Sequence, residues 1–232
     1  MKKFVIFILP LMMIFGGFAQ NDGAAAVHIS SALQEIAAIK AKGRILMIKE
    51  NYQIPAEHFF DKYADKFGFR QGNEMVLLNV TTAKNGNKTY RYQQQYMGVP
   101  IEDAIMLLHE KNGVVTYING VNMADFAKPY TPIFAADDAV ALAILNAPAD
   151  QYAWQVPTLE NDLKETMQDK DATYYPTPEL KFFDPKHGTD VSSYRLVYEV
   201  EVFAIQPLGK QVFYIDALSG EILKQIKKKS KR

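Results

Sequence analysis

Residues able to perform acid–base or metal chemistry are few in this sequence, and they lie far apart. The four histidines are His28, His58, His109 and His187, and none has a second histidine three or four residues away. A zinc site on a helix needs that spacing, because such residues share one helix face. The sequence contains no cysteine, so it offers neither thiolate ligands nor a cysteine nucleophile. We therefore predict no catalytic residue, no metal ligand and no cofactor.

Two local patterns begin like catalytic motifs but do not complete them. His109-Glu110 starts like the H-E-x-x-H motif of zinc proteases, but Gly113 stands where the second histidine is required. Asp137 and Asp138 are adjacent carboxylates, and neighbours on a helix do not face each other. Their position predicts a role at a helix N-terminus, where negative charge is favourable. The sequence thus indicates a protein that is not an enzyme.

Charge is unevenly distributed along the chain, although the formal net charge is zero. The last nine positions, 224–232, hold six basic residues and no acidic residue, which leaves the body of the protein acidic. An acidic body does not suit nucleic acid, whose phosphates require a basic surface. The basic end is typical of a solvated tail or linker, and contact with phosphate or anionic lipid stays open as the alternative.

The N-terminus has the pattern of an export signal. Residues 1–3 carry positive charge, residues 4–15 are apolar, and the small residues Gly17 and Ala19 occupy the −3 and −1 positions of a signal peptidase site. We expect cleavage between Ala19 and Gln20, and a mature protein that is secreted or periplasmic and holds no membrane segment. A retained anchor is the weaker alternative, because the apolar run is shorter than the ~20 residues that span a bilayer.

Hydrophobic periodicity predicts that helices precede strands in the first half of the chain. Apolar residues recur at helical spacing in two segments and then alternate with polar residues in four more. The predicted helices are 24–42 and 55–67, and the predicted strands are 75–80, 89–96, 104–109 and 114–119. These elements favour a helix packed on one face of four antiparallel strands.

The second half repeats this order of elements after Pro129 and Pro132. A nearly all-apolar helix over 136–146 comes first, followed by strands at 179–183, 194–203, 211–216 and 221–226. Residues 148–178 hold four prolines and the only tryptophan, and we expect a surface insertion with a short helix near 161–168. The predicted fold class is α+β, with two small domains that each pack a helix on an antiparallel β-sheet.

Two stretches of the sequence resemble known domain families. Residues 90–101, Y-R-Y-Q-Q-Q-Y-M-G-V-P-I, resemble the signature R-x-x-Q-x-Y-x-G-V-P-V of the fungalysin/thermolysin propeptide (FTP) domain. His109 and Ile118-Asn119-Gly120 follow in the order of that family, so the resemblance covers roughly 45–123. Residues 196–202 and 212–223 are similar to the end of a PepSY domain, with Ser219 where that family has threonine.

Both resemblances, in this order and behind an export signal, are similar to the prosegment of secreted thermolysin-like metalloproteases. The organisation this implies is a signal peptide at 1–19, an N-terminal helix at 20–44, an FTP-like domain at 45–126, a PepSY-like domain at 127–226 with the insertion 148–178, and a basic tail at 227–232.

The resemblance implies a chaperone that also inhibits the mature protease. Its partner would be the catalytic domain of a thermolysin-like zinc metalloprotease, in cis for a truncated precursor and in trans for a stand-alone protein. In that family the catalytic domain follows the prosegment, whereas this sequence ends at Arg232. A truncated or split reading frame, a stand-alone inhibitor or chaperone, an inactive remnant, and a non-catalytic extracellular binding module are the open alternatives.

A prosegment requires a surface that fits its protease. We expect this surface on the strand face opposite the tyrosines of 89–96, on the turn that follows, and on the polar face of the strand 194–203. The residues on it are Arg91, Gln93, Gln95, Val99, Pro100, Ile101, Glu199 and Glu201. The alternative is that the turn residues serve only packing, and that the two glutamates face solvent.

The export signal predicts that the mature protein begins at Gln20, which can cyclise to pyroglutamate. Mass spectrometry of the exported protein is expected to find Gln20 or its pyroglutamate form as the first residue. Ala19→Arg is the matched control and is expected to block cleavage, because the −1 position requires a small residue. A membrane-bound product that retains Met1 would contradict the prediction.

Overall fold

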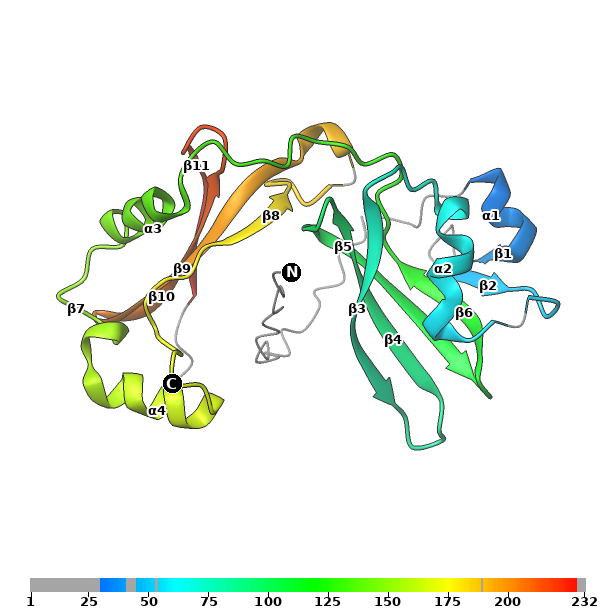
Figure 1. The fold of residues 1–232 in the computed structure, drawn as a ribbon, viewed down its shortest axis with the longest axis horizontal. Helices are drawn as coiled ribbons and strands as arrows, with labels where there is room; N and C mark the ends of the chain where they lie inside the picture. Colours follow the sequence, from blue (N-terminus) through cyan, green and yellow to red (C-terminus); the bar gives the residue numbers. More distant parts are fainter. Residues whose placement is uncertain (1–29, 41–44, 53, 189, 229–232) are drawn as a thin grey trace, which may run out of the picture.

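The computed structural model describes residues 30–40, 45–52, 54–188 and 190–228, which form two lobes joined near the middle of the molecule (Figure 1). Each lobe contains an antiparallel β-sheet and helices. The fold is therefore α+β, as the sequence predicted. The expected signal cleavage site at Ala19 and Gln20 lies outside the described residues. Among the residues that are described, no helix is long and apolar enough to cross a membrane.

The first sheet has six antiparallel strands in the order β1-β2-β6-β5-β4-β3. Their bounds are β1 Ala37–Lys40, β2 Ile45–Ile48, β3 Asn73–Thr82, β4 Lys88–Tyr96, β5 Val99–Lys111 and β6 Val114–Gly120. The last four were predicted from their alternation of polar and apolar residues. β1 and β2 extend the sheet on the far side of β6.

The predicted helix over 24–42 is wrong over 37–40. The helix α1 (Ser31–Ile36) begins at Ser30, whose hydroxyl accepts a hydrogen bond from the backbone N–H of Leu33, and it ends after six residues. The chain then runs as β1, which pairs with β2 and buries Ala37. Pairing with β2 satisfies the backbone groups that a longer helix would have satisfied internally. The remainder of the predicted helix lies outside the described residues.

The predicted helix over 55–67 is present as three consecutive turns of different type. A 3₁₀ turn (Ala56–His58), the helix α2 (Phe59–Tyr63) and a second 3₁₀ turn (Ala64–Phe67) follow one another, and Gly68 ends them with a left-handed backbone at φ 74°. The aromatic face of this segment packs on β4 and β5. The large side chains of this core are Phe59, Phe60, Tyr63, Phe67, Tyr90, Tyr92, Met106 and Leu108.

The second sheet contains β8 (Glu179–Phe183), β9 (Arg195–Gln206), β10 (Leu208–Asp216) and β11 (Ile222–Lys228), all antiparallel. The helix α3 (Ala136–Leu145) lies on the outer face of this sheet (Figure 1) and packs on it through Ala139, Val140 and Ala143. Asp137 and Asp138 occupy the first turn of α3, as predicted. The second lobe thus pairs a helix with an antiparallel sheet, as the first lobe does.

Part of the predicted insertion 148–178 belongs to the second sheet. The short strand β7 (Gln151–Tyr152) pairs with β9. The helix α4 (Pro157–Met167) follows and buries none of its residues, as expected of a surface insertion. It starts four residues before the predicted helix near 161–168, because Pro157 occupies the first helical turn, where its missing N–H is not needed.

The two lobes share one hydrophobic core at their junction. The strand β5 was predicted to start at 104 but starts at Val99, and its first residues leave the first lobe to pack in the second. Ile101 pairs in parallel with Phe182 of β8, which connects the two sheets. Phe126 completes the junction, with ring centroids 4.9 Å from Phe182 and 5.5 Å from Tyr194.

The strand β3 forms an open edge of the first sheet. Among the described strands it pairs only with β4, and its register shifts between Leu77 and Asn79. Three apolar side chains on it are 43%, 50% and 42% exposed, namely Leu77, Leu78 and Val80. This edge strand therefore exposes apolar side chains beside its unpaired backbone groups.

We predict that Phe126→Ala destabilises both lobes together, because Phe126 is fully buried in their shared core. The expected loss in the free energy of unfolding is about 3–5 kcal/mol. Urea denaturation followed by far-ultraviolet circular dichroism and by the fluorescence of Trp154, the only tryptophan, measures it. The control is Leu145→Ala, a large-to-small change at a 76% exposed position, for which less than about 0.5 kcal/mol is expected.

Candidate functional site

The candidate site is a surface cavity of about 390 Å³ where the first sheet meets β8. Tyr90 and Tyr92 of β4 point into the core below α2, so Arg91 and Gln93 point to the opposite face of the sheet. Figure 1 shows α2 and α3 on the outer sides of their sheets. The cavity is lined by Arg91, Gln93, Pro100, Glu102, Asp103, Ile105, Leu107, Asn119, Gly120, Val121 and Lys181.

Gln93, a predicted contact residue, is held by the backbone of β5. Its side-chain amide donates hydrogen bonds to the carbonyl oxygens of Ile101, at 2.6 Å, and Ala104, at 3.1 Å. These bonds span the place where the pairing of β4 and β5 shifts register. Gln93 therefore shapes the cavity wall, and its amide is occupied by the protein itself.

The other predicted contact residues near the turn differ in whether they line the cavity. Val99 and Ile101 are buried in the junction core, so their side chains have no surface to offer a partner. Pro100 lines the cavity, whereas Gln95, which pairs across from it, does not. The sequence could not separate these positions, because strand alternation breaks at the register shift between Gln93 and Gln95.

Glu199 and Glu201, predicted on a polar strand face, are both ion-paired. Glu199 lies 2.6 Å from the ammonium group of Lys181, which lines the cavity. Glu201 lies 2.8 Å from Lys210 and 3.0 Å from Lys228. The structure therefore connects Glu199 to the cavity wall through Lys181 and places Glu201 in a separate cluster.

Glu102 is the most perturbed acid of the cavity wall. Burial raises the pKa of its carboxyl group to about 6, although Lys181 acts in the opposite direction. Its Oε2 atom is buried and has no hydrogen-bond partner among the described residues, and the ammonium group of Lys181 lies 3.8 Å from it. Burial alone would lower the pKa of Lys181, but the carboxylates of Glu199 and Glu102 outweigh it and raise that pKa.

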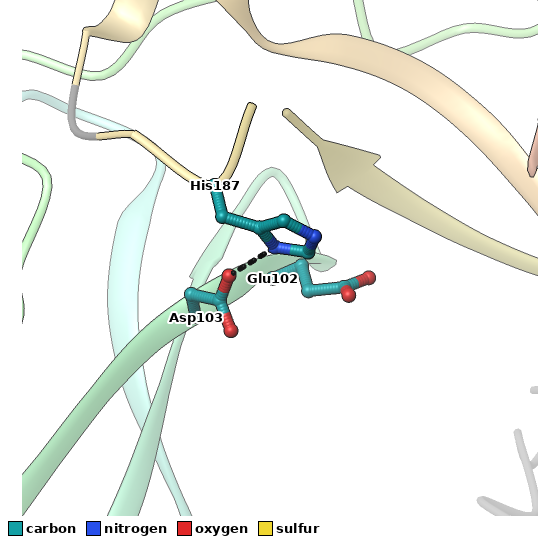
Figure 2. A group of neighbouring side chains, drawn as sticks. All are labelled: Glu102, Asp103 and His187. Carbon is teal, nitrogen blue, oxygen red and sulfur yellow. Dashed lines mark hydrogen bonds and ion pairs between the residues drawn. The ribbon is translucent and has the colours of Figure 1, made fainter. Parts of the chain in front are cut away.

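Beside the cavity, Glu102, Asp103 and His187 bring three potential ligand atoms within 4.8 Å of one another (Figure 2). This group could not be predicted from the sequence, because His187 lies 84 residues from Asp103. Two carboxylates and an imidazole are ligand types that divalent cations use.

Both ring nitrogens of His187 are already engaged within the protein. Nδ1 lies 3.0 Å from the Asp103 carboxylate (Figure 2), and Nε2 lies 2.7 Å from the ammonium group of Lys224. The arrangement is that of a hydrogen-bonded contact that joins β5, the loop after β8 and β11. The expectation that the chain holds no metal stays a prediction.

We predict that Glu102 makes stability depend on pH. Its pKa lies above the ordinary value of 4.5, so the folded state binds the proton more tightly than the unfolded chain. The stability that this group contributes is present below pH 4.5 and is lost as the pH rises through about 6. Glu102→Gln is expected to raise the free energy of unfolding at about pH 7.5 by about 1–2 kcal/mol and to flatten its pH dependence between those values.

Urea denaturation on both sides of this window measures the effect. Glu199→Gln is the matched control and is expected to destabilise the protein near pH 7.5, because it removes the 2.6 Å partner of Lys181. If Glu102→Gln follows the same pH dependence as the unmodified protein, the assignment is wrong.

Comparisons with known proteins identify part of this architecture. Residues 73–120 match the family described as Fungalysin/Thermolysin Propeptide Motif. Thermolysin of Alicyclobacillus acidocaldarius subsp. acidocaldarius is 23% identical over 164 residues, which are 70% of this chain and 27% of thermolysin. Bacillolysin of Bacillus subtilis (strain 168) is 27% identical over 173 residues, which are 73% of this chain and 30% of bacillolysin.

A solved structure, the Bacillus megaterium YpeB C-terminal domain, matches with a TM-score of 0.31 and 13% identity, covering 82% of this chain and 74% of that one. The chain spans less than a third of the length of the two proteases. Their matches to this chain are nevertheless longer than the motif at 73–120. The resemblance at Tyr90–Ile101 is confirmed, because these residues lie within the range 73–120 that matches the Fungalysin/Thermolysin Propeptide Motif, and the chain is similar to thermolysin-like proteases over part of their length.

Proposed function

We propose that this chain is a non-catalytic chaperone and inhibitor of a thermolysin-like zinc metalloprotease. The observation that carries the proposal is the propeptide motif at residues 73–120, together with relatives that are proteases matched over less than a third of their length. The role needs no catalytic residue. It needs a stable scaffold and a surface complementary to the protease.

Two features of the fold support this role. The shared core around Phe126 ties the lobes together, so surfaces on both sheets can act as one. The cavity lies at that junction and opens on the sheet face opposite α2. A specific contact buries roughly 800 Å² on each partner, an area that surfaces on both lobes would supply together.

We also propose domain boundaries for the chain and its export from the cytoplasm. Residues 45–126 and 127–226 are the FTP-like and PepSY-like domains, preceded by the segment 20–44 and followed by the basic tail. Export by the signal peptide, with cleavage between Ala19 and Gln20, brings the protein to the same side of the membrane as a secreted protease. The protease acts in cis if a longer precursor exists and in trans otherwise.

We predict that residues 20–232 inhibit a thermolysin-like protease from the same source and raise its yield on refolding. Steady-state inhibition and the recovery of activity after dilution from denaturant measure the two effects. Slow cleavage of the inhibitor is expected first in chain outside the helices and strands, such as the segment 168–178 that follows α4.

Two variants of one residue control for folding. Tyr198→Asp is expected to abolish both effects, because Tyr198 is only 6% exposed and the change places a carboxylate in the second core. Tyr198→Phe removes only a 3.3 Å hydrogen bond to the backbone of Phe134, so it is expected to keep both. A folded chain that neither inhibits nor assists the protease at micromolar concentration would falsify the proposal and favour a binding module or an inactive remnant.

A further inference from the structure

We propose that the junction cavity binds an acidic side chain of the protease, with Arg91 as the residue that receives its carboxylate. The inference rests on the proposed function and specifies the chemistry of the contact. Its occupant is an aspartate or glutamate next to an apolar residue in an extended segment of the protease. The inference depends on which charged groups around the cavity are already ion-paired.

Arg91 is the cation of the cavity wall that has no ion pair within the described part of the protein. Lys181, the other cation of the wall, lies 3.8 Å from Glu102 and 2.6 Å from Glu199, so its charge is engaged by these two carboxylates. Asp103 lies 3.0 Å from His187. The guanidinium of Arg91 makes no ion pair or hydrogen bond with any described side chain. Of the two cations on the wall, Arg91 is therefore the one that can pair with an incoming carboxylate.

The position of Arg91 explains why its unpaired guanidinium would favour binding a carboxylate. Arg91 is partly buried, and it sits on a central strand between Asn79 of β3 and Leu107 of β5. A guanidinium that loses part of its water without gaining a partner is unfavourable. Its planar fork binds a carboxylate through two parallel hydrogen bonds, which recovers the lost interaction.

The rest of the wall selects among anions. Pro100, Ile105, Leu107 and Val121 present apolar surface beside Arg91, which suits an apolar neighbour of the acidic residue. Glu102 and Asp103 belong to the same wall, and a ligand with several negative charges would be repelled by them. One carboxylate on a peptide therefore fits better than phosphate or a polyanion. The hydrogen bonds of Gln93 to β5 hold this surface in place before binding.

Inhibition of the protease by Arg91 variants tests the proposal. Arg91→Met keeps the length of the side chain and is expected to raise the inhibition constant by about tenfold to a hundredfold, the value of a charge-assisted hydrogen bond. It should also weaken the salt dependence of inhibition. The inhibition constant of Arg91→Lys should lie between those of the unmodified chain and Arg91→Met, because an ammonium group is charged but lacks the planar fork. Lys111→Met, at the exposed end of β5, is the matched control and should stay within about twofold.

A second measurement does not depend on inhibition. The N–H signal of the Arg91 side chain in nuclear magnetic resonance should shift on titration with the peptide acetyl-Leu-Asp-Leu-amide and not with acetyl-Leu-Asn-Leu-amide. If the unmodified chain inhibits and folded Arg91→Met inhibits equally well, the inference is overturned and the proposed function stands. If the chain does not inhibit and the aspartyl peptide causes no shift, both are overturned. A shift without inhibition retains the carboxylate site and rejects the protease role.

Discussion

Phe126, Phe182 and Tyr194 pack against one another at the point where the two sheets meet, with ring centroids 4.9 and 5.5 Å from that of Phe126. These rings come from the end of the first lobe, from β8 and from the residue directly before β9. Among the described strands, the backbone pairing between the two sheets is limited to the bridge from Ile101 to Phe182, so side-chain packing must fix their relative position. The cavity, the ionic contacts of Glu102 and Asp103, and the orientation of the inner faces all depend on this contact.

The residues that make the propeptide signature recognisable are largely structural. Gln94 is fully buried and exchanges two hydrogen bonds with the backbone of Met123, which fastens the end of the first lobe to β4. Gly120 has φ 129°, and a Cβ there would collide with the carbonyl oxygen of Ile105. In the second lobe, Asp216 accepts hydrogen bonds from the backbone of Leu218 and Ser219. Gln94 and Gly120 therefore serve the scaffold, whereas Arg91 and Pro100 of the same motif line the cavity.

The sequence allowed most strands and the α+β class to be predicted, because one face of each sheet is buried and alternation reports it directly. It did not reveal β1, β2 or β7, which are short and carry too few residues for a period to be recognised. The start of β5 was missed because Val99 and Ile101 are buried by the other lobe, and local pattern carries no information on that contact. Arg91 and Pro100 could be predicted as surface candidates from local pattern. That Lys181 of the other lobe lines the same cavity could not be predicted, because it depends on how the lobes pack.

The open edge of β3 has a consequence for the behaviour of the protein in solution. A strand with exposed Leu77, Leu78 and Val80 and a single charged residue, Glu74, is a template on which another extended chain can pair. The register shift at Leu77 interrupts this template, and Lys84 and Lys88 lie at the turn that ends the strand. The irregular backbone and the repulsion between lysines of neighbouring molecules therefore both oppose edge-to-edge aggregation. Solubility should therefore fall as salt screens these lysines, which makes ionic strength the variable to control when the protein is concentrated.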